Sequence, residues 1–204
     1  MKITELNLHV TDKMNGKMKG FSSFSVASDR FCQKMSKNKK SICYKCYYQK
    51  RMKGCYPDLD NVLKDNFKKL NKTNKKLDWP ILNVSWFRLG AFTDIQNEKI
   101  MNHYLDFIEK NSHVTFALWT KNIKIVSKVI RKRGKPSNLI LVRSSTILNK
   151  ADQLPEYFDK VFTVWDKESV KKGKVRINCG SKSCLDCRLC YTKNKTVFIN
   201  EVLK

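Results

Sequence analysis

The sequence predicts an α/β protein with a parallel sheet, on three observations. Short apolar runs of the kind that form buried strands recur along residues 79–166. Segments with helical spacing of apolar residues separate these runs, which is typical of consecutive strand–helix units. All eight cysteines lie outside this region, in two groups near the ends of the chain. Such units form either an open doubly wound sheet or a partial barrel, and the periodicity does not choose between them.

The first part of the chain is predicted to carry little regular structure. Residues 1–29 are expected to be an irregular lead-in that contains one short strand over residues 21–26. The cysteine segment 30–55 is expected to begin as a loop and to become helical from about Tyr44. A helix follows, with Asp58 or Asp60 as its cap and with apolar positions at Val62, Leu63, Phe67 and Leu70.

The middle of the chain supplies the strand–helix units. Four apolar runs are predicted as strands: residues 81–89, 114–119, 139–142 and 161–164. Thr93 and Gln96 fit a capping box ahead of the helix that follows the first of these strands. The chain is thus divided into a lead-in, a partial βα barrel with an N-terminal cysteine loop, and a C-terminal cysteine-rich segment, over residues 1–29, 30–166 and 167–204.

Polar residues follow the predicted strands and are expected to gather at one edge of the sheet. In parallel α/β folds, ligands bind at the C-terminal edge of the strands. The candidates there are Arg88, Gly90, Asp94, Thr120, Lys121, Ser144, Ser145, Trp165 and Asp166. Each residue alone is as well explained by capping or turn formation, so only the set indicates a site.

The cysteines are the strongest functional signal. The first group is Cys32, Cys43, Cys46 and Cys55, and the second is Cys179, Cys184, Cys187 and Cys190. The N-terminus lacks the apolar core of an export signal, so we expect a cytoplasmic, reducing compartment, that of the host if a phage encodes the chain. In such a compartment, clustered thiols are more often metal ligands than disulfides.

The spacing of the cysteines favours iron–sulfur clusters over zinc. The second group places four thiols within twelve residues, a density that resembles the ligand runs of ferredoxins. Four-cysteine zinc sites usually separate two pairs by a longer loop, and zinc stays open as the alternative. One or two [4Fe–4S] clusters are therefore predicted, with Cys55 as an optional fourth ligand of the first.

The run Cys43-Tyr44-Lys45-Cys46 resembles the end of the radical S-adenosylmethionine (radical SAM) signature, C-x3-C-aromatic-x-C. The continuation through Tyr47 and Tyr48 to Arg51 is similar to a stretch of spore photoproduct lyase and of phage relatives. Segments 88–92, 119–122 and 187–191 resemble a small phage and plasmid family. Ten residues separate Cys32 from Cys43, where the signature has three.

The resemblance implies a radical-SAM-like partial (βα) barrel. Cys32, Cys43 and Cys46 would hold a [4Fe–4S] cluster whose open iron takes S-adenosylmethionine. Tyr44 would flank the adenine, Arg88 and Lys121 would meet the carboxylate, and Gly90 would lie near the amino group. The enzyme class implied is a SAM-dependent radical enzyme.

The positive charge is large and accompanies the cysteines. The formal net charge is +24. Residues 13–76 contain 18 Lys and Arg against 4 acidic residues, and residues 167–195 contain 9 against 2, whereas 77–166 contain 13 against 9. Such charge attracts a polyanion such as nucleic acid, compensates anionic thiolate clusters, or reflects an AT-rich genome.

Two functions of different classes follow. The first is an iron–sulfur protein, with radical chemistry on a nucleic acid or another anionic substrate. The second is a non-catalytic nucleic-acid-binding phage protein that zinc or an iron–sulfur cluster stabilises, with interleaved Lys and aromatic residues as its contacts. No apolar run approaches the ~18 residues that a transmembrane helix needs, so no membrane partner is expected.

Overall fold

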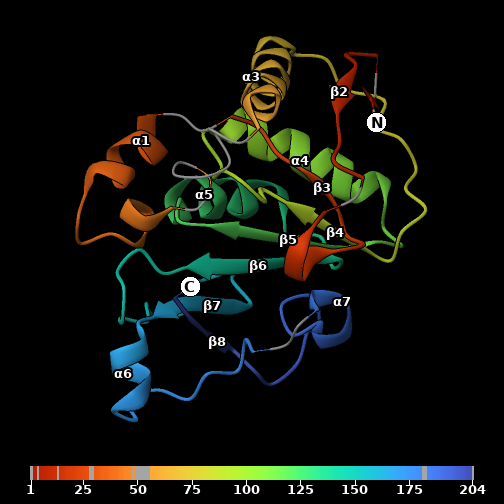
Figure 1. The fold of residues 1–204 in the computed structure, drawn as a ribbon. Coiled ribbons are helices and arrows are strands. Elements are labelled where there is room, and N and C mark those ends of the chain that lie inside the picture. Colours follow the sequence, from red (N-terminus) through yellow and green to blue (C-terminus); the bar gives the residue numbers. More distant parts are fainter. Residues whose placement is uncertain are drawn as a thin grey trace.

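The computed structural model describes residues 2–3, 5–12, 14–27, 30–46, 48, 56–180 and 183–203, which form an α/β fold. Its centre is a six-stranded sheet in which all neighbouring strands are parallel (Figure 1). The strands lie side by side in chain order: β3 (Ser22–Phe24), β4 (Trp86–Leu89), β5 (Thr115–Thr120), β6 (Leu139–Ser144), β7 (Lys160–Trp165) and β8 (Phe198–Val202). The α/β class and the parallel sheet predicted from the sequence are confirmed.

The order of the strands in the sheet excludes the doubly wound sheet, one of the two predicted arrangements. A doubly wound sheet reverses its strand order at a switch point, whereas here the order runs without reversal from β3 to β8. Within the described part of the chain, β3 and β8 each pair with one strand of the sheet, and Thr11 bridges the other side of β3, so the sheet is open and does not close into a barrel.

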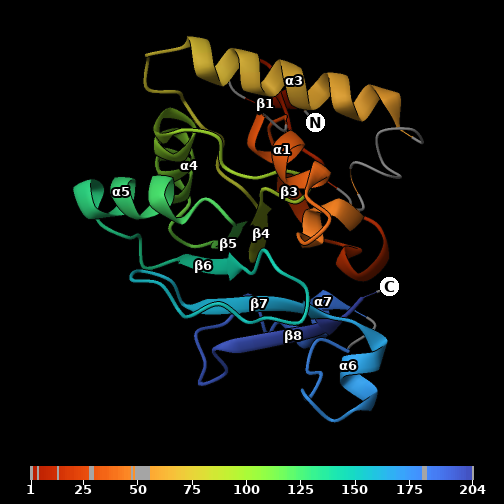
Figure 2. The ribbon, with the colours of Figure 1, turned by 90° about the vertical axis from the view of Figure 1, so that its left-hand side faces the viewer.

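Helices connect and flank these strands. They are η1 (Gly16–Met18), α1 (Arg30–Lys37), η2 (Ile42–Lys45), α3 (Pro57–Lys72), α4 (Glu98–Lys110), α5 (Ile123–Arg133), α6 (Lys167–Lys171) and α7 (Cys184–Cys187). A separate antiparallel pair consists of β1 (Lys2–Ile3) and β2 (Leu8–His9). In Figure 2, α4 and α5 lie on one side of the sheet and α7 on the other.

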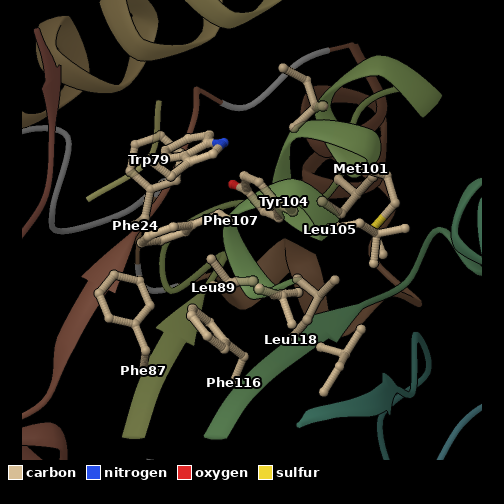
Figure 3. Packing of buried hydrophobic residues seen from close by; sticks show 14 of the residues in the cluster. Phe24, Trp79, Phe87, Leu89, Met101, Tyr104, Leu105, Phe107, Phe116 and Leu118 are labelled. Carbon is tan, nitrogen blue, oxygen red and sulfur yellow. The ribbon is translucent and has the colours of Figure 1, made fainter. Parts of the chain in front are cut away.

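Alternation along the strands sends side chains to two faces of the sheet. Phe116 and Leu118 of β5 enter the large core beneath α4, which Figure 3 shows with Phe107 and Tyr104 of that helix. Ala117, between them on β5, belongs to the smaller cluster on the other face. Burial of each large apolar side chain in the main core contributes about 1.5–3 kcal/mol to folding.

The smaller cluster lies between the sheet and the C-terminal cysteine segment. Phe21, Ile140 and Tyr191 are buried in it, and Cys184 and Leu185 of α7 pack against it. The second face of the sheet is therefore covered by the segment that carries four of the cysteines.

The predicted strand over residues 81–89 was wrong in its first part, because β4 begins only at Trp86. The buried amide of Asn111 accepts from the Leu82 N–H at 2.7 Å and donates to the Pro80 carbonyl oxygen at 3.0 Å. His113 Nε2 lies 2.8 Å from the Leu82 carbonyl oxygen. These side chains satisfy backbone groups that a strand would pair with a neighbour.

The predicted capping box before α4 was also wrong. Asn97 is the N-cap, and its side chain accepts from the Ile100 N–H at 2.9 Å. The Thr93 hydroxyl donates instead to the Val26 carbonyl oxygen and joins two segments of the sheet edge. Asparagine at this position caps a helix as well as threonine does.

The helices around the first cysteine group differ from the prediction as well. The turn at Tyr44 is a short 3-10 helix, and α1 precedes it where a loop was expected. The N-cap of α3 is Tyr56, while Asp58 and Asp60 lie in the first turn, where their charge favours the helix dipole.

Two strands of the six-stranded sheet lie outside the range predicted for the barrel. β3 comes from the lead-in, at the position where a short strand was expected, and β8 comes from the C-terminal segment, where none was expected. None of the helices in the described part of the chain is long and apolar enough to cross a membrane.

Candidate metal centre

Contacts with β8 and with the lead-in position the first cysteine of the C-terminal group. The Cys179 N–H donates to the Asn200 carbonyl oxygen at 3.0 Å. Lys17 Nζ donates to the Cys179 carbonyl oxygen at 3.2 Å and lies 3.8 Å from its Sγ. The same ammonium forms an ion pair with Glu201 of β8 at 2.7 Å. Residues 162 positions apart in the chain thus meet at this thiol.

A single turn of helix positions the next two cysteines. Ser183 caps α7 by accepting from the Leu185 N–H at 3.2 Å, and Cys184 and Cys187 are the first and last residues of the helix. Arg188 then adopts a left-handed conformation with φ of 49° and ends the helix. The chain turns there and returns to the sheet, which brings the fourth cysteine beside the other three.

The four C-terminal cysteines line one hollow. Its cavity volume is about 30 Å³, and it is partly open to solvent. Its walls are Lys17, Cys179, Ser183, Cys184, Cys187, Arg188, Leu189, Cys190, Tyr191 and Ile199. The four are free thiols. The structure therefore brings this sequence-predicted group together at one place.

The thiols surround the hollow and do not converge on one point. Among the described residues, no group of three or more His, Cys, Asp or Glu is placed so that it could hold a metal ion. Around a tetrahedral zinc ion, sulfurs at about 2.3 Å from the metal lie roughly 3.8 Å from one another. The cysteines of this hollow thus differ from a closed zinc site.

Burial makes these thiols weak acids. It raises the pKa of Cys179 to about 11 and that of Cys190 to about 12, and it also raises the pKa of Cys184. The Glu201 carboxylate raises the pKa of Cys179 further, and neighbouring thiolates raise the pKa of all three thiols. Lys17 lowers the pKa of Cys179 and Cys184, and Arg88 lowers that of Cys184 and Cys190. Protons would have to leave before a metal could bind, as at any thiolate site.

Cationic side chains surround the hollow. Besides Lys17, Arg88 of β4 lies near Cys184 and Cys190. Its guanidinium carbon is 3.2 Å from the centre of the Trp119 ring. The Arg188 guanidinium lies 4.5 Å above the ring of a second tryptophan, on β4.

A buried lysine adds to this positive charge. Lys160 at the start of β7 is 1% exposed, and its ammonium donates to the Asn194 side chain at 3.0 Å and to the Thr196 carbonyl oxygen at 2.8 Å. Burial lowers the pKa of Lys160, and the nearby Cys190 and Asp159 oppose this effect.

The N-terminal group gathers more loosely. Cys32 lies on α1, Cys43 lies on η2, and Cys46 follows η2; these two helices pack against each other. Burial and the Asp60 carboxylate raise the pKa of Tyr48, and Cys46 and Cys32 raise it further, which places both thiols near this phenol. The predicted optional ligand, Cys55, lies outside the described residues.

The N-terminal group lies at the C-terminal edge of the sheet. The Ile42 N–H donates to the Thr146 carbonyl oxygen at 2.8 Å, just after β6. Lys45 lies near Asp166, which follows β7 and whose pKa it helps to lower. In Figure 1, the arrowheads of β5 and β6 point toward α1. The first cysteine group thus occupies the edge where ligands bind in parallel α/β folds.

Several polar residues predicted at this edge do meet. Asp94 accepts from the Thr120 hydroxyl at 2.5 Å and from the Lys121 N–H at 2.7 Å. Lys121 Nζ donates to the Ser144 hydroxyl at 2.9 Å. Burial raises the pKa of Asp94, and the positive charge of Lys121 opposes this effect. Ser145 joins Thr163 of β7 at 2.9 Å.

The residues predicted to bind a cofactor have different neighbours. Arg88 contacts Trp119 and lies near the C-terminal thiols, whereas Lys121 lies in the polar set at the edge. Gly90 has a φ of 63°, and a Cβ there would lie 3.1 Å from the Thr93 carbonyl oxygen, so glycine serves the backbone turn. Tyr44 is 38% exposed on η2.

Sequence reasoning missed three residues of the C-terminal site: Lys17, Lys160 and Tyr191. Lys17 lies in the polar lead-in, and its proximity to Cys179 depends on the packing of η1 against α7. Lys160 opens an apolar strand and carries no signal of its burial. The aromatic Tyr191 directly follows Cys190, which was the one available indication.

The fold and the hollow define the class: an α/β protein with an open parallel sheet, one face of which carries four cysteines. The chain belongs to the gene product 88 family, whose family model matches residues 3–201. This match agrees with the resemblance to a phage-type family, and it carries no assignment to radical SAM or iron–sulfur proteins. No curated protein and no solved structure matches the chain.

Proposed function

We propose that this protein is an iron–sulfur protein and that its C-terminal cysteines hold a [4Fe–4S] cluster. The observation that carries the proposal is that Cys179, Cys184, Cys187 and Cys190 line one hollow on the second face of the sheet. Cysteine thiolates at close sequence spacing are the usual ligands of such clusters. Four cysteines supply the full donor set that a [4Fe–4S] cluster requires.

The positive surroundings support the same proposal. Four thiolates outweigh the positive charge of an iron–sulfur core, so the bound cluster is anionic. Arg88 and Lys160 lie close to these thiols and would offset that charge, whereas Lys17 is already paired with Glu201. A set of neutral structural thiols would gain nothing from these two cations.

The N-terminal group is proposed to hold a second cluster. Cys32, Cys43 and Cys46 lie at the C-terminal edge of the sheet and offer three thiolates, which would leave one iron open to S-adenosylmethionine. When bound there, the cluster and this cofactor would supply reductive radical chemistry. Lys121, with its ammonium at the same edge, would pair with a carboxylate, and Tyr44 would lie beside an adenine.

The substrate class that the charge favours is an anionic one, including nucleic acid. The net charge of +24 and the concentration of Lys and Arg around both cysteine groups support this proposal. Binding of a polyanion does not require a cluster, whereas radical chemistry on that polyanion does.

Anaerobic purification followed by iron, acid-labile sulfide and zinc analysis tests the proposal. Wild type is expected to be brown and to contain iron and sulfide in equal amounts. The iron and sulfide of the C-terminal cluster should be lost in Cys184→Ala/Cys187→Ala. Those of the N-terminal cluster should be lost in Cys43→Ala/Cys46→Ala. Asn102→Ala, on the far helix α4, is the matched control and should keep both.

The rival interpretation is a zinc-stabilised protein without redox chemistry. A colourless wild type that contains zinc and no iron would favour it and would overturn the cluster proposal. Radical chemistry requires a further observation, the release of 5′-deoxyadenosine from S-adenosylmethionine by the reduced protein.

A further inference from the structure

Arg88 lacks the counter-charge that the other internal arginine has. Arg143 is paired with Asp152 at 2.7 Å. Arg88, by contrast, forms no ion pair with any carboxylate of the described residues, and the Nε of each of these two arginines is buried without a hydrogen-bond partner. A buried charge without a partner is costly, and proteins retain one where something compensates it.

The position of Arg88 identifies what could compensate it. Side chains alternate along β4, so Arg88 projects from the sheet face opposite the main core, where Trp119 lies beneath its guanidinium. The nearby groups that can carry negative charge are the thiols of Cys184 and Cys190 and the phenol of Tyr191. The phenol is a hydrogen-bond partner of Arg88, and the guanidinium lowers its pKa against the effect of burial.

Stacking fixes the guanidinium in this place. A planar guanidinium over an indole ring gains a cation–π interaction and loses little freedom of motion. The ring of Trp119 belongs to the same cluster as Tyr191, whose ring centre is 5.6 Å away. Stacking therefore holds the charge of Arg88 at a fixed place, unlike the charge of a flexible surface side chain.

We propose that Arg88 is the half-buried counter-charge of an anionic cluster held by Cys179, Cys184, Cys187 and Cys190, and that it favours the reduced state of this cluster. This inference rests on the proposed function and adds how the site is tuned. A low-potential one-electron donor, for which dithionite stands in the test below, loses one electron and adds it, and so one negative charge, to a complex that is already anionic. No bond to the protein forms or breaks in this step. A fixed cation nearby stabilises the more negative state and thus raises the reduction potential.

Substitutions of Arg88 test this role in the full chain. The background is Cys43→Ala/Cys46→Ala, so that only the C-terminal group responds. Arg88→Gln removes the charge, and Arg88→Met does so while it keeps apolar contact with Trp119, whereas Arg88→Lys retains the charge. Arg131→Gln, on exposed α5, removes an equal charge far from the hollow and serves as the matched control. Each anaerobically purified variant is titrated with dithionite and followed by electron paramagnetic resonance.

Arg88→Gln and Arg88→Met should keep iron and sulfide but shift the reduction equilibrium at least tenfold toward the oxidised state, a potential lower by about 59 mV for one electron. The reduction potential of Arg88→Lys should stay near that of wild type, and that of Arg131→Gln should be unchanged.

Loss of the cluster in both neutral variants, with retention in Arg88→Lys and an unchanged circular dichroism spectrum, would also support the charge role. A shift in Arg88→Gln no larger than that in Arg131→Gln would overturn the inference and leave the cluster proposal standing. Absence of iron and sulfide from the background protein overturns both.

Discussion

Gly20 allows the lead-in to approach the C-terminal cysteine helix closely. Its φ is 87°, and a Cβ at this position would lie 2.7 Å from Leu185 Cδ1 of α7. An L-residue in this conformation is strained whatever space surrounds it. Here the neighbouring side chain adds a steric reason. Gly20 therefore contributes to holding Lys17 beside Cys179.

Gly20→Ala is expected to lower the free energy of unfolding by about 2–3 kcal/mol. About 1–2 kcal/mol of this comes from the left-handed backbone, and the remainder from displacement of Leu185. Gly16→Ala is the matched control, since Gly16 has a φ of 63° with open space around it, and it should cost only the backbone share. Urea denaturation of both variants measures the difference. A steric role for Leu185 would be contradicted if both variants lost the same free energy of unfolding. It would also be contradicted if adding Leu185→Ala to Gly20→Ala restored none of the lost stability.

The elements of the fold were predictable where a local pattern determined them. β5, β6 and β7 lie where apolar runs predicted them, because a central parallel strand needs apolar residues on both faces. β8 was missed because it lies at the sheet edge and mixes Phe198, which is exposed, with polar residues. The first part of the predicted strand over 81–89 failed because a distant amide, Asn111, pairs with its backbone.

Asn111→Ala is expected to lower the free energy of unfolding by about 3 kcal/mol. Its buried amide satisfies three backbone groups, those of Leu82, Pro80 and Phe107, and its loss would leave them unpaired. Asn102→Ala removes an amide of α4 that donates to the Glu98 carbonyl oxygen at 2.8 Å and accepts from Arg133 at 3.4 Å. It should cost about 1 kcal/mol, on the order of one partly buried hydrogen bond. Chemical denaturation measures both, and similar costs would refute the structural role of Asn111.

For the molecule as a whole, the cysteine spacing predicted which thiols lie together but not which other residues surround them. Four thiols within twelve residues come together only where the chain turns back on itself, as it does after α7, and the structure places them around one hollow. Their location against the second face of the sheet, and the approach of Lys17 and Arg88, depend on contacts between distant segments. No local pattern carries such information.

The whole chain gathers positive charge around its thiols, and this arrangement leads to the central claim that the C-terminal group holds a [4Fe–4S] cluster. Mössbauer spectroscopy of Cys43→Ala/Cys46→Ala, reconstituted anaerobically with ⁵⁷Fe and sulfide, tests it most directly. We predict the signal of a four-iron cluster with thiolate ligation at every iron, absent after further Cys184→Ala/Cys187→Ala substitution. Isolated single-iron sites, or a spectrum unchanged by that substitution, would contradict the claim.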